Sequence, residues 1–165
     1  MELQVTPKEP ELPDLSVKKE LANYKDKGSS WWSNENSCYY AYWRVTVSTE
    51  NGSGGTVKLS DKITGFPGKH NTTDIPIRLF KQNANGTQTE LSVETEPYRY
   101  TVSKGGSELS FAALPELKEG EKYILYYATK AADEDLKAMC KNNKPSIMYN
   151  EATAKTDKVE EVSSG

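Results

Sequence analysis

Apolar and polar residues alternate along several short stretches of this chain, which is the pattern of strands with one buried face. Turn-forming residues separate these stretches, as in the Gly/Asn-rich segments 50–55 and 83–86. The predicted strands are 15–22, 39–48, 56–61, 75–80, 98–102, 123–129 and 147–156. Short alternating strands joined by such turns predict an all-β, immunoglobulin-like sandwich.

In one segment the apolar residues recur at the spacing of a helix instead of alternating as in a strand. Segment 131–141 places Ala132, Leu136, Met139 and Cys140 on one helical face, with acidic residues early and lysines late. It predicts a short amphipathic helix that crosses between the last two strands. We expect a lid over an open end of the sandwich, and the alternative is a partner-binding helix.

The length of 165 residues predicts one domain with tails. Three prolines and several charges make residues 1–13 a linker or leading arm, residues 14–157 form the sandwich domain, and the charged residues 158–165 form a tail or a linker to a next domain. The start of the chain lacks the regions of a secretion signal, so the chain is either cytosolic or an excised domain, and we favour the second reading.

A net charge of −3 leaves no broad cationic surface, which argues against nucleic-acid binding. No apolar run approaches the length that crosses a bilayer. The sequence predicts no cofactor and no metal site: the only histidine, His70, lies in a Gly/Pro/Asn-rich stretch and is expected to be solvated. Cys38 and Cys140 either form a disulfide that closes a long loop or remain two buried thiols.

Strand parity places three polar residues on faces that are otherwise apolar or small. Lys19 shares its face with Leu15, Val17 and Leu21, whereas Lys18 points to solvent. In the same way, Asp61 aligns with Val57, Leu59 and Ile63, and Asn150 aligns with Met148, Ala152 and Ala154. All three residues are therefore expected to face the core.

These three residue types can form a covalent cross-link. A buried, neutral lysine is a nucleophile. A protonated aspartic acid that hydrogen-bonds the asparagine carbonyl makes the amide carbon electrophilic, so that Lys19 attacks Asn150 and ammonia leaves while Asp61 acts as the acid. The enclosing core brings the groups together and excludes water. The modification occurs once per molecule, so the protein is not expected to be an enzyme.

The chain resembles domains of Gram-positive surface adhesins and pilins of the collagen-adhesin-like, isopeptide-forming type. The stretches that carry the resemblance are 17–21, 42–47, 57–63, 117–127 and 149–154. The resemblance implies an extracellular domain at the bacterial cell surface, anchored to the cell wall through another part of the parent protein. It also implies that Lys19 and Asn150 are the bonded pair, that Asp61 is the catalytic acid, and that neighbouring domains of the same surface protein are partners. The Trp31–Trp32 pair, the two cysteines and the predicted helix depart from the family's pattern.

An alternative function is carbohydrate binding, with a host glycan or a matrix protein as the partner. Trp31, Trp32, Tyr39 and Tyr40 lie close together in the sequence, and aromatic faces are platforms for sugar rings. The surrounding serines and asparagines would supply hydrogen bonds. The competing explanation is that the tryptophans cap the sandwich. A hydrolase is a third reading, but neither a pair of catalytic acids nor a Ser-His-Asp arrangement is recognisable.

Overall fold

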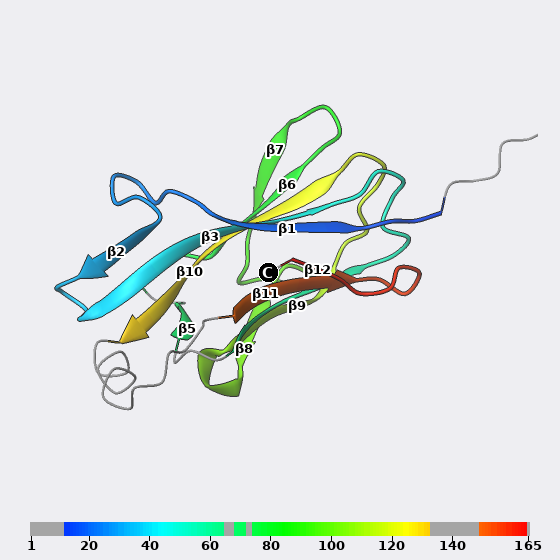
Figure 1. Ribbon diagram of the computed structural model, residues 1–165. Coiled ribbons are helices and arrows are strands. Elements are labelled where there is room, and N and C mark those ends of the chain that lie inside the picture. Colours follow the sequence, from blue (N-terminus) through cyan, green and yellow to red (C-terminus); the bar gives the residue numbers. More distant parts are fainter. Residues whose placement is uncertain (1–11, 65–67, 72–73, 133–148, 165) are drawn as a thin grey trace, which may run out of the picture.

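The computed structural model describes residues 12–64, 68–71, 74–132 and 149–164. The described strands form two antiparallel sheets packed as a sandwich, which confirms the all-β, immunoglobulin-like prediction (Figure 1). The larger sheet has the order β1-β3-β10-β6-β7, with β2 paired to β3 and β5 paired to β10. The smaller sheet has the order β12-β11-β4-β9-β8.

Seven of the strands correspond to predicted ones, and their ends differ from the predicted ends by at most three residues. They are β1 (Ser16–Leu21), β3 (Cys38–Ser48), β4 (Val57–Thr64), β6 (Arg78–Gln82), β8 (Tyr100–Ser103), β10 (Lys122–Ala132) and β11 (Tyr149–Lys155). Five strands were not predicted, namely β2 (Ser30–Ser33), β5 (Gly68–Asn71), β7 (Gln88–Leu91), β9 (Glu108–Leu114) and β12 (Val162–Ser164), and a short 3-10 turn, η1 (Lys104–Gly106), precedes β9. The missed strands are mostly short and polar, so the alternation that marks a strand is weak in them.

The predicted helix over 131–141 is wrong at its start. Residues 131 and 132 continue β10, where Ala131 pairs with Tyr39 of β3 and with Gly68 of β5. Ala131 is buried between these two strands of the sheet, so tertiary pairing overrides the local preference. Residues 133–141 lie outside the described residues.

The segment predicted as a tail, 158–165, contributes a strand to the fold. Ala152 and Ala154 of β11 pair with Ser164 and Val162 of β12, which places β12 at the edge of the smaller sheet. The backbone N–H of Lys19 on β1 donates to Ser164 Oγ, which joins the edge strands of the two sheets. The sandwich is therefore closed on this side.

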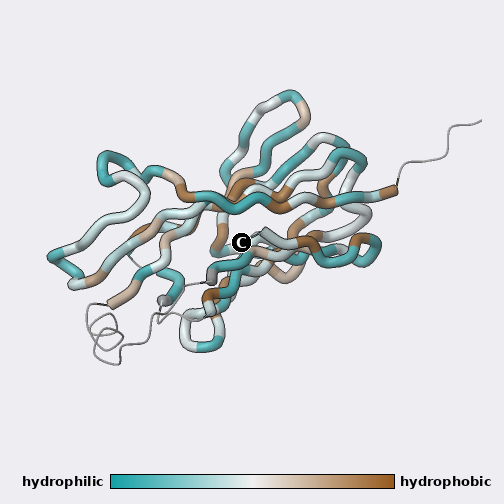
Figure 2. Tube along the Cα trace, viewed as in Figure 1, coloured by the Kyte–Doolittle hydropathy of each residue, from teal (hydrophilic) through white to brown (hydrophobic). Residues whose placement is uncertain are grey.

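The main core lies between the two sheets. Figure 2 shows hydrophobic segments, coloured brown, on strands of both layers. Val57, Leu59, Asp61 and Ile63 are all buried, which confirms the predicted inner face of β4. The inner face of β11 is confirmed at Asn150, Ala152 and Ala154, and Met148 lies outside the described residues.

The predicted inner face of β1 is confirmed in part. Leu15 is buried and the Lys19 side chain is 1% exposed. Leu21, however, is 49% exposed at the end of this edge strand, so the buried face does not extend to it.

A second apolar cluster lies on the outer face of the larger sheet. Its buried members are Ala22, Cys38, Tyr40, Tyr42, Ile75 and Ala128. Tyr24 and Trp31 pack against it, with their rings stacked at 5.5 Å. Side chains of β3 and β10 that point away from the main core therefore also become buried.

Candidate functional site

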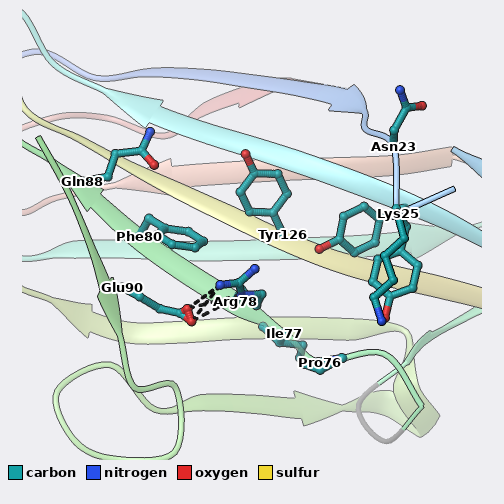
Figure 3. A pocket seen from close by; sticks show the side chains of 11 residues that line it. Asn23, Lys25, Pro76, Ile77, Arg78, Phe80, Gln88, Glu90 and Tyr126 are labelled. Carbon is teal, nitrogen blue, oxygen red and sulfur yellow. Dashed lines mark hydrogen bonds and ion pairs between the residues drawn. The ribbon is translucent and has the colours of Figure 1, made fainter. Parts of the chain in front are cut away.

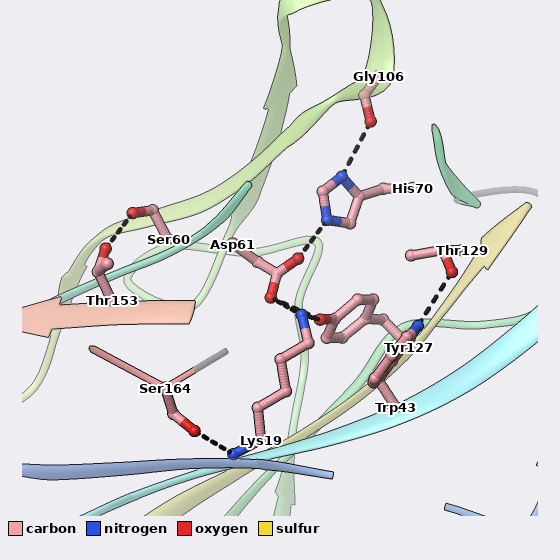
Figure 4. A network of polar contacts seen from close by, with 10 residues as sticks. All are labelled: Lys19, Trp43, Ser60, Asp61, His70, Gly106, Tyr127, Thr129, Thr153 and Ser164. Carbon is pink, nitrogen blue, oxygen red and sulfur yellow. Dashed lines mark hydrogen bonds and ion pairs between the residues drawn. The ribbon is translucent and has the colours of Figure 1, made fainter. Parts of the chain in front are cut away.

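The candidate site is a buried polar network between the two sheets (Figure 4). At its centre is Asp61 on β4, whose side chain is only 2% exposed. Its Oδ2 accepts hydrogen bonds from Lys19 Nζ and from the Tyr127 hydroxyl, each at 2.5 Å. Its Oδ1 lies 2.7 Å from Nε2 of His70. One carboxyl group thus connects three strands besides its own.

Lys19 reaches this carboxyl group from β1, on the other sheet. Its Nζ also donates to the Tyr127 hydroxyl at 2.5 Å and lies 4.9 Å from the centre of the Trp43 ring. The Trp43 indole is held in turn by a 2.9 Å hydrogen bond from its Nε1 to Thr129. The amine is therefore enclosed by aromatic rings and has an oxygen contact on two sides.

Asn150 lies on the same inner face as Asp61, on the neighbouring strand. The residue opposite Asp61 in β11 is Ala152, so Asn150 occupies the diagonal position two residues away, which is within side-chain reach. Asn150 is buried, and neither polar atom of its amide has a hydrogen-bond partner among the described residues. The hydrogen bond from Asp61 to Asn150 that the predicted chemistry uses is thus not formed in this arrangement.

The surroundings change the acid–base behaviour of the network. Burial lowers the pKa of Lys19 to about 8, although the charge and hydrogen bond of Asp61 oppose this shift. The pKa of Tyr127 is raised well above its usual range, first by burial and then by the Asp61 charge. Near neutral pH the lysine can lose its proton more readily than in water, while the phenol keeps its own.

Two members of the network were not identified from the sequence. His70 was expected to be solvated, but it lies on β5 with its side chain fully buried, so that expectation is wrong. Because residues typical of loops surround it, the four-residue strand β5 was not predicted. Tyr127 shares a face with Tyr123 and Leu125 by strand parity, and this signal could have placed it in the core.

Chemically, the network can deliver a neutral amine beside an amide in a closed, dry space. In such a space a neutral lysine can act as a nucleophile and a carboxyl group can accept and return a proton, and the Tyr127 hydroxyl contacts both groups. Among the described residues there is no cluster of three or more His, Cys, Asp or Glu side chains that would hold a metal ion.

The predicted aromatic ligand site is divided between two faces of β2 and β3. Trp32 and Tyr39 are 36% and 50% exposed, and their rings meet at 4.8 Å. Tyr40 is buried and donates a 2.7 Å hydrogen bond to Asp74, and Trp31 is half-buried against its ring. Tyr40 is therefore a packing residue.

Trp31 and Trp32 nevertheless border an open hollow of about 440 Å³, which is also lined by Asn34, Glu35 and Asn36. A second hollow of about 700 Å³ lies next to it, and Tyr24 and Lys25 line both hollows. Figure 3 shows the second hollow, where Phe80 and Tyr126 pack edge to face near an ion pair between Arg78 and Glu90. The sequence did not indicate this second hollow.

The cysteines are described only in part. Cys38 is buried and has no disulfide partner among the described residues. Cys140 lies outside the described residues, so the Cys38–Cys140 disulfide remains a prediction. In the described part of the chain, no helix has the length and apolar character needed to cross a membrane.

Comparison with known proteins shows the fold. No protein-family model and no curated protein sequence matches this chain. Solved structures do: the collagen-binding subdomain of the Enterococcus faecalis surface protein ACE superposes with a TM-score of 0.51 at 9% identity over 86% of this chain and 94% of that one. The collagen-binding domain of a Staphylococcus aureus adhesin superposes with a TM-score of 0.50 at 10% identity. The match covers 88% of this chain and 89% of that one.

A structure of the RrgA Jo.In complex superposes with a TM-score of 0.50 at 14% identity, over 87% of this chain and 70% of that one. At such identities the likeness concerns the arrangement of strands alone. This chain has the sandwich fold found in surface-adhesin domains of Gram-positive bacteria.

Proposed function

We propose that this chain is a structural and adhesive domain of a bacterial cell-surface protein, and that an amide bond between Lys19 Nζ and Asn150 Cγ cross-links its first and last core strands. Asp61 is the acid that assists the condensation. The domain acts outside the cell, is anchored to the cell wall through another part of its parent protein, and contacts neighbouring domains of that parent. The protein modifies itself once and has no other catalytic role.

One observation carries this proposal: Lys19 is a buried amine with a lowered pKa in contact with a buried carboxyl group. A lysine in such a place serves packing poorly, because removing its charge from water is costly. The same argument applies to Asn150. A buried amide without a hydrogen-bond partner costs about 1–3 kcal/mol, and neither polar atom of the Asn150 amide finds such a partner among the described residues, so packing accounts poorly for this residue too.

Such a bond would change how the domain bears load. Force applied through the two ends of the described chain would act on a covalent link between β1 and β11 instead of on hydrogen bonds between strands. A surface protein exposed to shear and proteases benefits from this arrangement. Adhesins with this fold bind collagen, so a matrix protein such as collagen is a suitable first candidate for a host partner.

Intact-mass measurement of the reduced protein tests the proposal. The expected result is a deficit of one ammonia relative to the calculated mass, absent from Lys19→Ala and from Asn150→Ala. Peptide mapping should recover one branched peptide that contains both residues. The full calculated mass for the reduced wild type would rule out the cross-link.

A second candidate function is carbohydrate binding at the hollow beside Trp32. An exposed indole next to amide and carboxylate side chains is the combination that holds a sugar ring. Binding on a glycan array should be lost in Trp32→Ala and retained in Val102→Ala, an equally exposed apolar residue on the smaller sheet. Absence of binding by the wild type would leave Trp32 as a packing residue.

A further inference from the structure

His70 is a buried titratable group that the proposed condensation does not use. Its side chain has no exposed surface, and it contacts polar atoms on both sides of the ring. Nε2 lies 2.7 Å from Asp61 Oδ1, and Nδ1 lies 2.9 Å from the backbone carbonyl oxygen of Gly106 (Figure 4). A histidine placed in this way has little rotational freedom.

The Gly106 contact determines which ring nitrogen carries hydrogen. A carbonyl oxygen can only accept, so Nδ1 must be the donor. The contact between Nε2 and Oδ1 then requires one further proton, because two lone pairs at that distance would repel each other. This proton is carried either by Asp61 as a carboxylic acid or by His70 as an imidazolium. Asp61 and His70 therefore hold one proton between them at Oδ1.

The other oxygen of Asp61 is in a different environment. Oδ2 accepts hydrogen bonds from Lys19 Nζ and the Tyr127 hydroxyl, whereas the contact with the histidine is made by Oδ1. The groups that face the Asp61–His70 pair are Lys19 from β1, Tyr127 from β10, whose ring centre lies 5.5 Å from that of His70, and the carbonyl of Gly106, the last residue of η1. The two carboxyl oxygens are thus assigned to different partners.

We propose that His70 is a positioning residue for the cross-linking reaction. Its hydrogen bond to Oδ1 of Asp61, which contains the shared proton, fixes the orientation of the carboxyl group, so that Oδ2 is the oxygen that accepts the proton from Lys19. This inference rests on the proposed function. A carboxyl group without that partner could rotate and exchange its oxygens, and the amine would lose its fixed proton acceptor.

The reaction balances with Oδ2 as a shuttle, provided that the shared proton lies on Nε2 of His70 while Oδ2 holds the proton from Lys19. The Nζ lone pair of neutral Lys19 forms the bond to Cγ of Asn150, and one Nζ proton passes to Oδ2. The bond from Cγ to Nδ2 then breaks, and Nδ2 takes the proton from Oδ2 and leaves as ammonia. Asp61 and His70 end with the protons that they had at the start. No oxidant, reductant or water is consumed.

A time course of the full-length chain tests this role. Wild type and His70→Ala are made by short cell-free synthesis, and the loss of ammonia is followed by intact mass over pH. The wild type is expected to lose ammonia at least about tenfold faster than His70→Ala. Added imidazole should restore the rate in His70→Ala with a pH dependence that follows the titration of imidazole, whereas thiazole, which has a similar shape but no N–H, should not.

His70→Gln provides a second variant if His70→Ala does not fold, and it should react slowly for the same reason. Ser53→Ala is the stability control, because Ser53 is a buried, hydrogen-bonded residue near the opposite end of β11, and this variant should react like the wild type. Equal rates in the wild type and both His70 variants, or equal rescue by thiazole and imidazole, would overturn the role of His70 and leave the cross-link intact. A wild type that never loses ammonia would instead refute the proposed function.

Discussion

Lys19 Nζ and Asp61 Oδ2 lie 2.5 Å apart although the two residues belong to different sheets of the sandwich. Their side chains are 1% and 2% exposed, so the pair is shielded from water on all sides. Buried pairs of this kind are seldom net stabilising, because desolvation offsets most of their attraction. A chemical role accounts for the pair better than stability does.

Asp61→Ala should abolish the cross-link. Without the carboxyl group, Lys19 loses the group that accepts its proton in the proposed reaction and returns it to the leaving nitrogen. Intact mass of the reduced variant should equal the calculated value. Lys62→Ala is the matched control, because Lys62 is the exposed neighbour on the same strand and its variant should keep the ammonia deficit. A deficit in Asp61→Ala would show that the condensation needs no acid at this position.

Asn150→Ala should lower the free energy of unfolding by about 5 kcal/mol, the chain-entropy value for a link that closes a loop of more than 100 residues. The truncation itself should cost little, because neither polar atom of the Asn150 amide has a hydrogen-bond partner among the described residues. Urea unfolding measures the difference, and digestion by protease should accelerate in parallel. A change below about 1 kcal/mol would indicate that the wild type contains no cross-link.

The stability of Asn150→Ala should increase with pH between 8 and 10. Lys19 has a pKa of about 8 in the folded protein and a higher one when unfolded, so the unfolded state binds more protons in this window. The expected gain is about 2 kcal/mol in the free energy of unfolding. Above pH 10 the raised pKa of Tyr127 works in the opposite direction, since tyrosine then ionises more readily in the unfolded chain.

The double variant Lys19→Met/Asn150→Ala is the control for this dependence. Urea titrations of both proteins at pH 8, 9 and 10 should show a rising midpoint only where Lys19 is present. If the urea midpoint rises equally with pH in the two proteins, the pH dependence comes from groups other than Lys19.

Tyr127→Phe should slow the cross-linking reaction without abolishing it. The variant keeps the ring that covers Lys19 but removes the hydroxyl that donates to Asp61 and accepts from the lysine. A mixture of linked and unlinked masses is expected shortly after synthesis, and the unlinked fraction should decrease with time. Tyr123→Phe is the comparison, since the Tyr123 hydroxyl donates to the carbonyl of Pro115 outside this network. Equal linked fractions in the two variants at every time would contradict a role for the Tyr127 hydroxyl.

The sequence by itself determined the sandwich fold and the inward direction of its central polar residues. Alternation along β4 and β11 was enough to place Asp61 and Asn150 in the core, because side chains of a strand alternate between its two faces. The same reasoning placed Lys19, while it failed for Leu21 at the end of the edge strand.

Only the tertiary structure decided which partners meet inside the core. His70 comes from a short polar strand that forms only because β10 extends far enough to pair with it. The tail segment became β12 for the same reason, since pairing with β11 satisfies its backbone groups. Local patterns report which face of a strand is buried. The contacts of Asp61 with Lys19, Tyr127 and His70 depend on how strands distant in the sequence pack together, and no local pattern encodes that.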